Sequence, residues 1–155
     1  MRRDSTGKRP RLWVSASKDT SALVSIRAKR YHGAMKQKKT ALLERIANDP
    51  QVTPFRRKVY EALLEVSPGR VTTYGLLGKR VGCASARAVG GALRENPFAP
   101  EVPCHRVVAA DLSIGGFNGC REGGEIARKI GLLVGEGVPL DERGRLLDAR
   151  RVWRF

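Results

Sequence analysis

Acidic residues, cysteines and long apolar runs are all scarce in this sequence, and each scarcity excludes a class of protein. No apolar run is long enough to cross a membrane, and the amino terminus lacks the basic, apolar and small-residue order of a secretory signal. We therefore expect an intracellular protein that binds no membrane. It would be nuclear in a eukaryote and otherwise located in the cytoplasm or nucleoid.

Cysteine and histidine are too few and too scattered for a structural zinc site. The three cysteines, Cys83, Cys104 and Cys120, form no C-x-x-C pair, and the only histidines are His32 and His105. An odd number of cysteines leaves one thiol over in any disulfide scheme, which suits a reducing compartment and makes a reactive thiol worth seeking. We expect no bound metal.

Basic residues outnumber acidic ones by 30 to 15, which gives a net charge of +15. Such a surface favours a polyanionic partner, because neutralised phosphates release condensed counterions. Nucleic acid is the leading candidate. On charge alone, an anionic membrane surface, a ribosomal role and a merely well-solvated basic surface stay open.

The length of 155 residues allows one compact domain with extensions. We expect residues 1–52 to form a basic N-terminal region, either a reduced domain or a partly disordered extension, and residues 53–155 to form the main domain. Residues 1–10 are polar and basic and are typical of disorder. The alternating patch at 23–26 indicates a strand, and residues 40–47 indicate a short helix.

Helix signals become clear from Thr53 onward. Thr53 is suited to an N-cap, and Pro54 suits the first helical position, where its missing N–H costs nothing. A stripe of apolar residues at helical spacing follows, made of Phe55, Val59, Leu63 and Val66. The Ser-Pro-Gly sequence at 67–69 ends this helix.

Two further helices with a short turn between them predict a helix-turn-helix. Thr73 can cap the first, which carries Leu76, Leu77 and Val81, and Gly82 breaks it. The second covers about 84–96 and stops before Pro97.

Glycines in the middle of that second helix invite two interpretations. Gly90 and Gly91 each cost about 1 kcal/mol relative to alanine. They allow either close packing against another helix or a thin helix whose backbone approaches a narrow minor groove without reading bases. Arg87, near the start of the helix, could reach a phosphate or fill the gap that a flipped base leaves.

The densest chemistry lies in the sequence Pro-Cys-His-Arg-Val at 103–107. A free thiol is only a few per cent ionised at neutral pH, so a reactive cysteine needs an imidazole, a positive charge or a helix N-terminus to lower its pKa. His105 and Arg106 adjoin Cys104, and Glu136 is a possible carboxylate to orient the imidazole. The sequence thus predicts an ionised Cys104 thiol.

The order of these motifs resembles the active-site domain of the alkylguanine-DNA alkyltransferases. The matching segments are residues 53–55, 71–74, 87–92, 96–97, 103–108, 115–117, 128–129, 132–133 and 136–138. The resemblance as a whole covers about residues 53–152, roughly two-thirds of the chain.

The resemblance implies a mainly helical α+β fold with a winged helix-turn-helix. This domain would bind the minor groove of double-stranded DNA and rotate an alkylated guanine, mainly O6-methylguanine, into a pocket. Cys104 would accept the alkyl group irreversibly, in one stoichiometric turnover, from a monomer that needs no cofactor.

The resemblance also assigns roles to individual residues. His105, polarised by Glu136, would take the thiol proton through a water, and Asn96 would brace the turn that carries Cys104. The base would be bound by Tyr74, which donates to the guanine ring, and by groups at Val107, Phe117 and Asn118. The DNA-binding residues would be Arg87, Thr73, Ser85, Ala86, Ala88, Gly90, Gly91 and Arg94.

The sequence departs from the family pattern at several positions. Phe117 stands where many members carry tyrosine, Asn118 replaces a common serine, and residues 120–124 lengthen a loop beside the pocket. The segment before residue 53 is shorter than the usual amino-terminal domain. These differences bear on the size of alkyl group that fits.

Rival interpretations remain for single residues and for the whole chain. Tyr74 could cap a core, Asn96 could merely end a helix, and Glu136 could be a solvated carboxylate. For the chain, the alternatives are an alkyltransferase-like protein that binds flipped lesions without transfer, a cysteine hydrolase, and a structural DNA-binding protein. The lesion-binding proteins typically carry tryptophan in place of the acceptor cysteine, so Cys104 favours transfer.

Overall fold

The computed structural model describes residues 19–155, with side chains from Gly33 onward. The disorder expected for residues 1–10 lies outside the described residues. The chain divides into two compact units, residues 1–38 and 39–155. The second unit contains every element of the predicted helix-turn-helix and all of the reactive centre.

Helix α1 (Asp19–Asn48) replaces the strand that the sequence predicts. The prediction of a strand at 23–26 is wrong, because the patch is short and the neighbouring Ala28, Lys29 and Arg30 are good helix formers. The helix expected at 40–47 is confirmed as the last part of α1. In this part Leu42 and Ile46 are buried in the core of the second unit, which therefore begins upstream of residue 53.

Three short helices follow, and side-chain caps fix where each begins. They are α2 (Pro54–Leu63), α3 (Tyr74–Arg80) and α4 (Ala86–Arg94). The Thr53 hydroxyl accepts from the Arg56 amide, Thr73 from Leu76, and Ser85 from Ala88. The predicted caps at Thr53 and Thr73 are thereby confirmed. The positive φ of Gly82 separates α3 from α4, as the sequence predicts.

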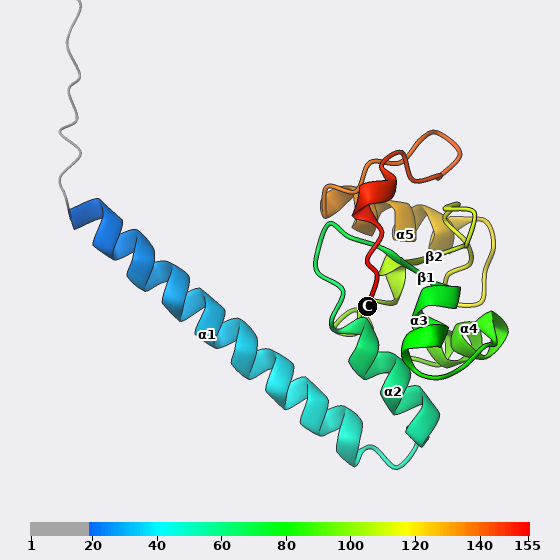
Figure 1. Cartoon of the computed structure of the whole chain (residues 1–155), viewed down its shortest axis with the longest axis horizontal. Coiled ribbons are helices and arrows are strands. Elements are labelled where there is room, and N and C mark those ends of the chain that lie inside the picture. The colour runs from blue at the N-terminus through cyan, green and yellow to red at the C-terminus, as the bar shows by residue number, and fades with distance from the viewer. Residues whose placement is uncertain (1–18) are drawn as a thin grey trace, which may run out of the picture. The chain divides into compact units, whose positions relative to one another are not determined.

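A two-stranded parallel sheet joins the helices to the reactive centre. Strand β1 (Thr72–Thr73) pairs with β2 (Val107–Val108), which directly follows the 3-10 helix η1 (Cys104–Arg106). In Figure 1 this sheet lies between α5 (Gly124–Gly135) and the helices α3 and α4. A second 3-10 turn, η2 (Ala149–Arg151), precedes the carboxyl terminus. The mainly helical α+β class is confirmed, and the wing stays a prediction.

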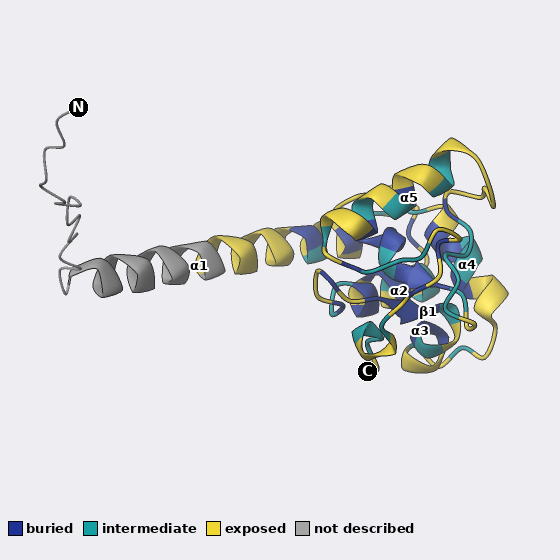
Figure 2. Cartoon of the chain, turned by 90° about the horizontal axis from the view of Figure 1, so that it is seen from above, coloured by how far each residue is buried: buried dark blue, intermediate teal, exposed yellow. Residues whose placement is uncertain are grey.

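The buried core holds η1 in place. Helices α2, α3 and α4 contribute Val59, Leu63, Leu77 and Val89, all 0% exposed, and Cys104 belongs to the same cluster. Figure 2 shows the buried residues concentrated inside the second unit, where these elements meet. The Tyr60 hydroxyl, also buried, donates to the Ala92 carbonyl at 2.9 Å and so ties α2 to α4.

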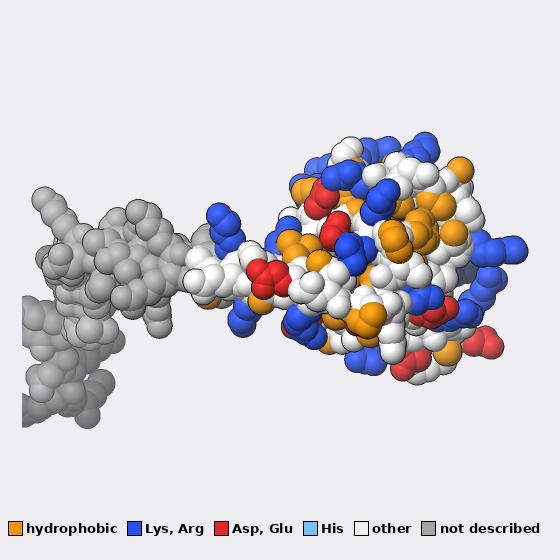
Figure 3. Space-filling model, turned by 90° about the horizontal axis from the view of Figure 1, so that it is seen from below, with side chains coloured by type: hydrophobic (Ala, Val, Ile, Leu, Met, Phe, Trp, Pro, Cys, Tyr) orange, Lys and Arg blue, Asp and Glu red, His pale blue; other side chains and the backbone are white. Residues whose placement is uncertain are grey.

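The surface of the second unit carries mostly basic charge. Lys and Arg side chains are spread over the face in Figure 3, with fewer acidic side chains among them. Among the described residues, no helix combines the length and the hydropathy needed to span a bilayer.

Two glycines distinguish close packing from open space in the helix-turn-helix. A Cβ built on Gly78 would lie 2.5 Å from the Cys83 carbonyl oxygen, whereas one built on Gly91 would meet nothing within 4 Å. We predict that Gly78→Ala lowers the free energy of unfolding by about 1–3 kcal/mol. Gly91→Ala should raise it by up to about 1 kcal/mol, since alanine favours a helix interior. Urea denaturation measures both, and equal effects of the two substitutions would contradict the packing described.

Candidate active site

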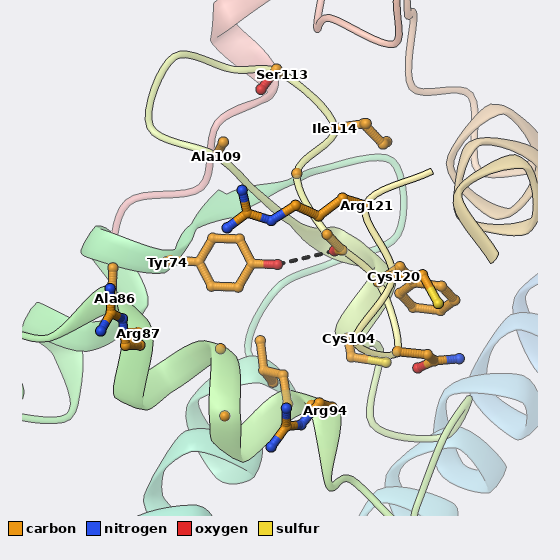
Figure 4. A pocket seen from close by; sticks show the side chains of 18 residues that line it. Tyr74, Ala86, Arg87, Arg94, Cys104, Ala109, Ser113, Ile114, Cys120 and Arg121 are labelled. Atoms are coloured by element: carbon orange, nitrogen blue, oxygen red, sulfur yellow. Dashed lines mark hydrogen bonds between the residues drawn. The ribbon is translucent and has the colours of Figure 1, made fainter. Parts of the chain in front are cut away.

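A cavity of about 910 Å³ opens between α4 and the loop that precedes α5. One wall is α4, with Gly90 and Gly91 facing the space, and the opposite wall is the segment 113–121. Cys104, which is 6% exposed, lines the same cavity, and Figure 4 shows it on the side of Cys120.

The structure brings many of the sequence-predicted site residues to this cavity and leaves the others outside its lining. The lining includes Tyr74, Ala86, Arg87, Gly90, Gly91, Arg94, Cys104, Phe117 and Asn118. His105, Glu136, Asn96 and Val107 are not among the lining residues, although His105 directly follows Cys104 in η1. Thr73, Ser85 and Ala88 lie outside its lining, and the hydroxyls of the first two cap helices.

Cys104 and His105 lie in a 3-10 turn and not in a strand, so their side chains need not point to opposite faces. Both can therefore serve one site. Burial raises the pKa of the Cys104 thiol above its ordinary value, although the Asn96 side chain, nearby backbone amides and the Lys129 charge favour the thiolate. The prediction of an ionised thiol is therefore wrong for the free protein. Desolvation, which depends on the whole fold, outweighs the local charges that the sequence reveals.

Glu136 accepts hydrogen bonds from both residues that follow Cys104. Its Oε1 lies 2.8 Å from His105 Nε2, and Arg106 reaches it through Nε and Nη2 at 2.7–3.1 Å. Although burial opposes ionisation, the bonds from Arg106 and His105 hold the pKa of Glu136 below its usual value. The sequence-based pairing of His105 with Glu136 matches this geometry.

His105 is 4% exposed, and burial lowers its pKa more than the hydrogen bond and charge of Glu136 raise it. The imidazole is therefore neutral at neutral pH. Because the carboxylate accepts at Nε2, the proton of the neutral ring resides there. Nδ1 then carries the lone pair and can accept a proton.

Asn96 braces the segment that leads to Cys104. Its side-chain amide donates to the Val102 carbonyl at 3.2 Å, and its oxygen accepts from the Phe98 amide at 2.9 Å. The same side chain favours the thiolate form of Cys104 and so opposes the rise in its pKa. Asn96 thus does more than end a helix.

Tyr74 projects into the cavity from the start of α3. Its hydroxyl donates to the Gly116 carbonyl at 3.1 Å, shown dashed in Figure 4. Burial raises the pKa of Tyr74, and a thiolate at Cys104, once formed, raises it further. The phenol stays protonated at neutral pH and can donate a hydrogen bond to a group in the cavity.

A tight hairpin forms the wall opposite α4. Phe117 and Cys120 exchange backbone hydrogen bonds of 2.8 and 2.9 Å around Asn118 and Gly119, whose φ values are +49° and +82°. Both central residues are left-handed, as in a type I′ turn, for which Asn-Gly is a favoured pair. The Asn118 side chain donates to Glu125 at 2.6 Å and anchors the turn to α5.

Lys129 is a site residue to which the sequence analysis gave no role. It is 0% exposed, and its ammonium donates to the carbonyls of Val107, Ile114 and Gly116 at 2.6–3.0 Å. Burial lowers its pKa to about 8, so it remains mostly charged at pH 7. The signal that could have identified it is a lysine at a core-facing position of a helix, four residues before the buried Leu133.

Lys129 also alters what Val107 can offer to a ligand. Its ammonium already donates to the Val107 carbonyl, so only the second lone pair of this oxygen remains for a base edge.

The free thiols Cys83 and Cys120 are half-buried and exposed respectively. Within the described part of the chain, no three His, Cys, Asp or Glu residues lie close enough to hold a metal ion.

Comparisons with known proteins agree with these features. A family model described as 6-O-methylguanine DNA methyltransferase, DNA binding domain, matches residues 54–138. A methylated-DNA–protein-cysteine methyltransferase of Thermococcus sibiricus is 49% identical over 87 residues, which are 56% of this chain and 46% of that protein. A DNA base-flipping protein of Thermus thermophilus is 46% identical over 87 residues, 56% of this chain and 55% of that one.

Among solved structures, S. pombe Atl1 in complex with damaged DNA containing O6-carboxymethylguanine is 30% identical, with a TM-score of 0.56. The match covers 65% of this chain and 95% of Atl1. The chain spans about half the length of the curated relatives it matches.

Substituting Glu136 tests the electrostatics of this cluster. We predict that Glu136→Gln lowers the pKa of His105 further below 6.5, because the carboxylate charge and its hydrogen bond both raise that pKa. NMR titration of the imidazole protons measures it, with His32→Ala to assign the signals. Glu125→Gln removes a carboxylate that bonds to Asn118 instead and should leave the titration unchanged. A His105 pKa that stays constant or rises in Glu136→Gln would refute the pairing.

Proposed function

The chain belongs to the 6-O-methylguanine DNA methyltransferase family, and on that premise we propose that it repairs alkylated DNA by transfer to Cys104. It flips O6-alkylguanine, mainly O6-methylguanine, out of duplex DNA. It then moves the alkyl group irreversibly to its own cysteine in one stoichiometric turnover, as a suicide S-methyltransferase. The observation that carries this proposal is the buried Cys104 thiol lining a cavity large enough for a nucleotide.

The transfer is an in-line displacement at the carbon attached to O6. The Cys104 sulfur forms a bond to this carbon while the bond from carbon to O6 breaks, and the electron pair stays on the guanine. The thiol loses a proton and the purine gains one, so charge balances. The product thioether is stable, which explains why each molecule acts once.

His105 is suited to take the thiol proton. Because the Cys104 pKa is raised and the imidazole is neutral, the thiol is protonated until substrate arrives and the base is ready to accept. We infer that the proton reaches Nδ1 through a water, while Glu136 stabilises the imidazolium that results. Arg106 keeps Glu136 ionised and correctly oriented for this step.

Tyr74 is suited to assist the leaving group. Its hydroxyl donates to the Gly116 carbonyl in the free protein and can turn to the guanine ring when a base enters. Its raised pKa keeps the donor protonated. A proton or hydrogen bond at the ring makes the purine a better leaving group.

We infer that α4 enters the minor groove. The helix presents Ala86, Ala88, Gly90 and Gly91, whose small side chains let the backbone approach the groove floor without reading sequence. Arg87 has no ionic partner among the described residues and can occupy the stack that the flipped base leaves. Arg94 at the end of α4, Ser85 at its N-cap and Thr73 at the N-cap of α3 complete the proposed contact surface.

A second candidate function is lesion binding without transfer. It is favoured by the likeness to S. pombe Atl1, which spans 95% of that chain, and by the base-flipping relative of Thermus thermophilus. Against it stands the cysteine at position 104, held beside the imidazole base His105 and a cavity.

We also propose that the protein is a monomer, needs no cofactor and is intracellular.

Intact mass separates the two candidates directly. On mixing with a duplex that carries O6-methylguanine, the chain should gain the mass of one methyl group, located on Cys104 by peptide mapping. We predict that Cys104→Ser abolishes the gain and keeps DNA binding, since the sulfur nucleophile is lost and the binding surface is not.

The control for this experiment is Cys83→Ser, which removes a thiol outside the cavity. It should gain the methyl group like the unmodified chain. Tight, lesion-selective binding by the unmodified chain with no change in mass would establish lesion binding instead of transfer.

Arg87 provides a separate test of base flipping. We predict that Arg87→Ala reduces extrusion about ten-fold, while affinity for undamaged duplex falls much less, because the side chain fills the vacated stack. Fluorescence of a base analogue reports extrusion, and titration reports affinity. Lys58→Ala, an exposed charge on α2, should change neither selectively. Equal losses of extrusion and affinity in Arg87→Ala would reduce its role to a phosphate contact.

A further inference from the structure

The charge of the cavity exceeds what a neutral alkylated base requires. Three arginines line it, Arg87 and Arg94 from α4 and Arg121 from the opposite wall, and the lining contains no Asp or Glu. A methylated guanine carries no charge that would need these guanidiniums. The cavity as a whole is therefore suited to an anion as well as a base.

Arg121 is the least explained of the three. It is exposed, and no described residue forms a hydrogen bond or an ion pair with it, whereas Arg94 lies 3.8 Å from Glu95. Figure 4 shows its side chain extending across the cavity toward Tyr74 and away from Cys104. Because Arg121 is exposed and lines the cavity, its guanidinium lies where the cavity opens to solvent, apart from the Cys104 sulfur.

The backbone that presents Arg121 is fixed on one side. Cys120 pairs with Phe117 across the Asn118-Gly119 turn, and the buried Phe117 ring lies 5.9 Å from the Lys129 ammonium. Beyond Arg121 the chain reaches Gly123, with a φ of +81°, before α5 begins. The backbone before Arg121 is thus anchored by the hairpin, while the guanidinium itself can change its position.

We propose that Arg121 binds a phosphate next to the extruded nucleotide and clamps it at the cavity mouth. An extruded nucleotide stays covalently joined to both neighbours, so at least one flanking phosphate must lie at the mouth when the base is inside. Guanidinium binds phosphate through two parallel N–H donors, which fixes orientation as well as position. This inference rests on the proposed function and adds a positioning residue to it.

The test combines a protein variant with a modified DNA. Single-turnover transfer is measured on a duplex with one O6-methylguanine, and on duplexes in which the phosphate 5′ or 3′ of the lesion is an uncharged methylphosphonate. Arg121→Ala should slow transfer from the normal duplex on the order of ten-fold, the range of a charge-assisted contact. One methylphosphonate should slow the unmodified chain similarly, and combining it with Arg121→Ala should slow transfer no further.

Two further variants control for the loss of positive charge in general and for the loss of the paired N–H donors of the guanidinium. Arg143→Ala removes an exposed arginine outside the cavity and should leave the effect of the methylphosphonate unchanged. Arg121→Lys keeps the charge without the paired donors and should recover only part of the rate. With free O6-methylguanine as substrate, Arg121→Ala should react like the unmodified chain, because no phosphate is present.

The clamp is wrong if the rate loss caused by Arg121→Ala multiplies with the rate loss caused by each of the two methylphosphonates. Independent losses of this kind mean that Arg121 and the phosphate do not touch. Slower reaction of the variant with the free base would also overturn it. Failure of the proposed function is distinguishable from either result, because the unmodified chain would then show no transfer from the normal duplex.

Discussion

The contact of Glu136 with His105 and Arg106 fixes the short turn on which the reactive centre depends. Glu136 follows α5, whereas His105 and Arg106 belong to η1, so three charged or polar groups join segments about thirty residues apart in sequence. A buried ionic cluster contributes little net stability, because desolvation offsets attraction. Its contribution here is to specify position: it sets the tautomer of His105 and the direction in which Cys104 faces.

Burial holds the cysteine, histidine and tyrosine of the site in their uncharged forms until a ligand enters. The pKa of Cys104 is raised, that of His105 is lowered and that of Tyr74 is raised, in each case with desolvation as the largest cause. Lys129 supplies a buried positive charge and orders the carbonyls of Ile114 and Gly116 in the cavity wall, together with that of Val107. A thiol protected in this way resists adventitious alkylation, and under the proposed function its proton is removed only when the damaged base arrives.

Local signals in the sequence predicted local structure well. Thr53, Thr73 and Gly82 act within a few residues of themselves, so their roles as caps and breaker could be read directly. The strand predicted at 23–26 failed because helix-forming neighbours outweigh a short alternating patch. The family resemblance brought Cys104, His105 and Glu136 together correctly. It could not give the pKa of the thiol, because that depends on burial by residues from the whole domain.

Two features have clear signals in the sequence but were not among the predictions. Asn118-Gly119 is a favoured pair for a type I′ turn, and the turn sets the cavity wall from which Arg121 extends. Lys129 occupies a core-facing helix position, where a charge is uncommon without partners. Their consequences for the cavity, however, depend on contacts with Gly116 and Val107 that no spacing rule supplies.

The proposed transfer requires that an extruded, alkylated guanine enter the cavity with its alkyl carbon facing position 104. A crystal structure of Cys104→Ser bound to a duplex with one O6-methylguanine tests it most directly. We expect the base between Tyr74 and the 117–120 hairpin, with the substituted hydroxyl oxygen about 3–3.5 Å from the methyl carbon, as a near-attack geometry requires. A lesion that remains stacked in the duplex, or a base whose methyl group points away from residue 104, would contradict the account.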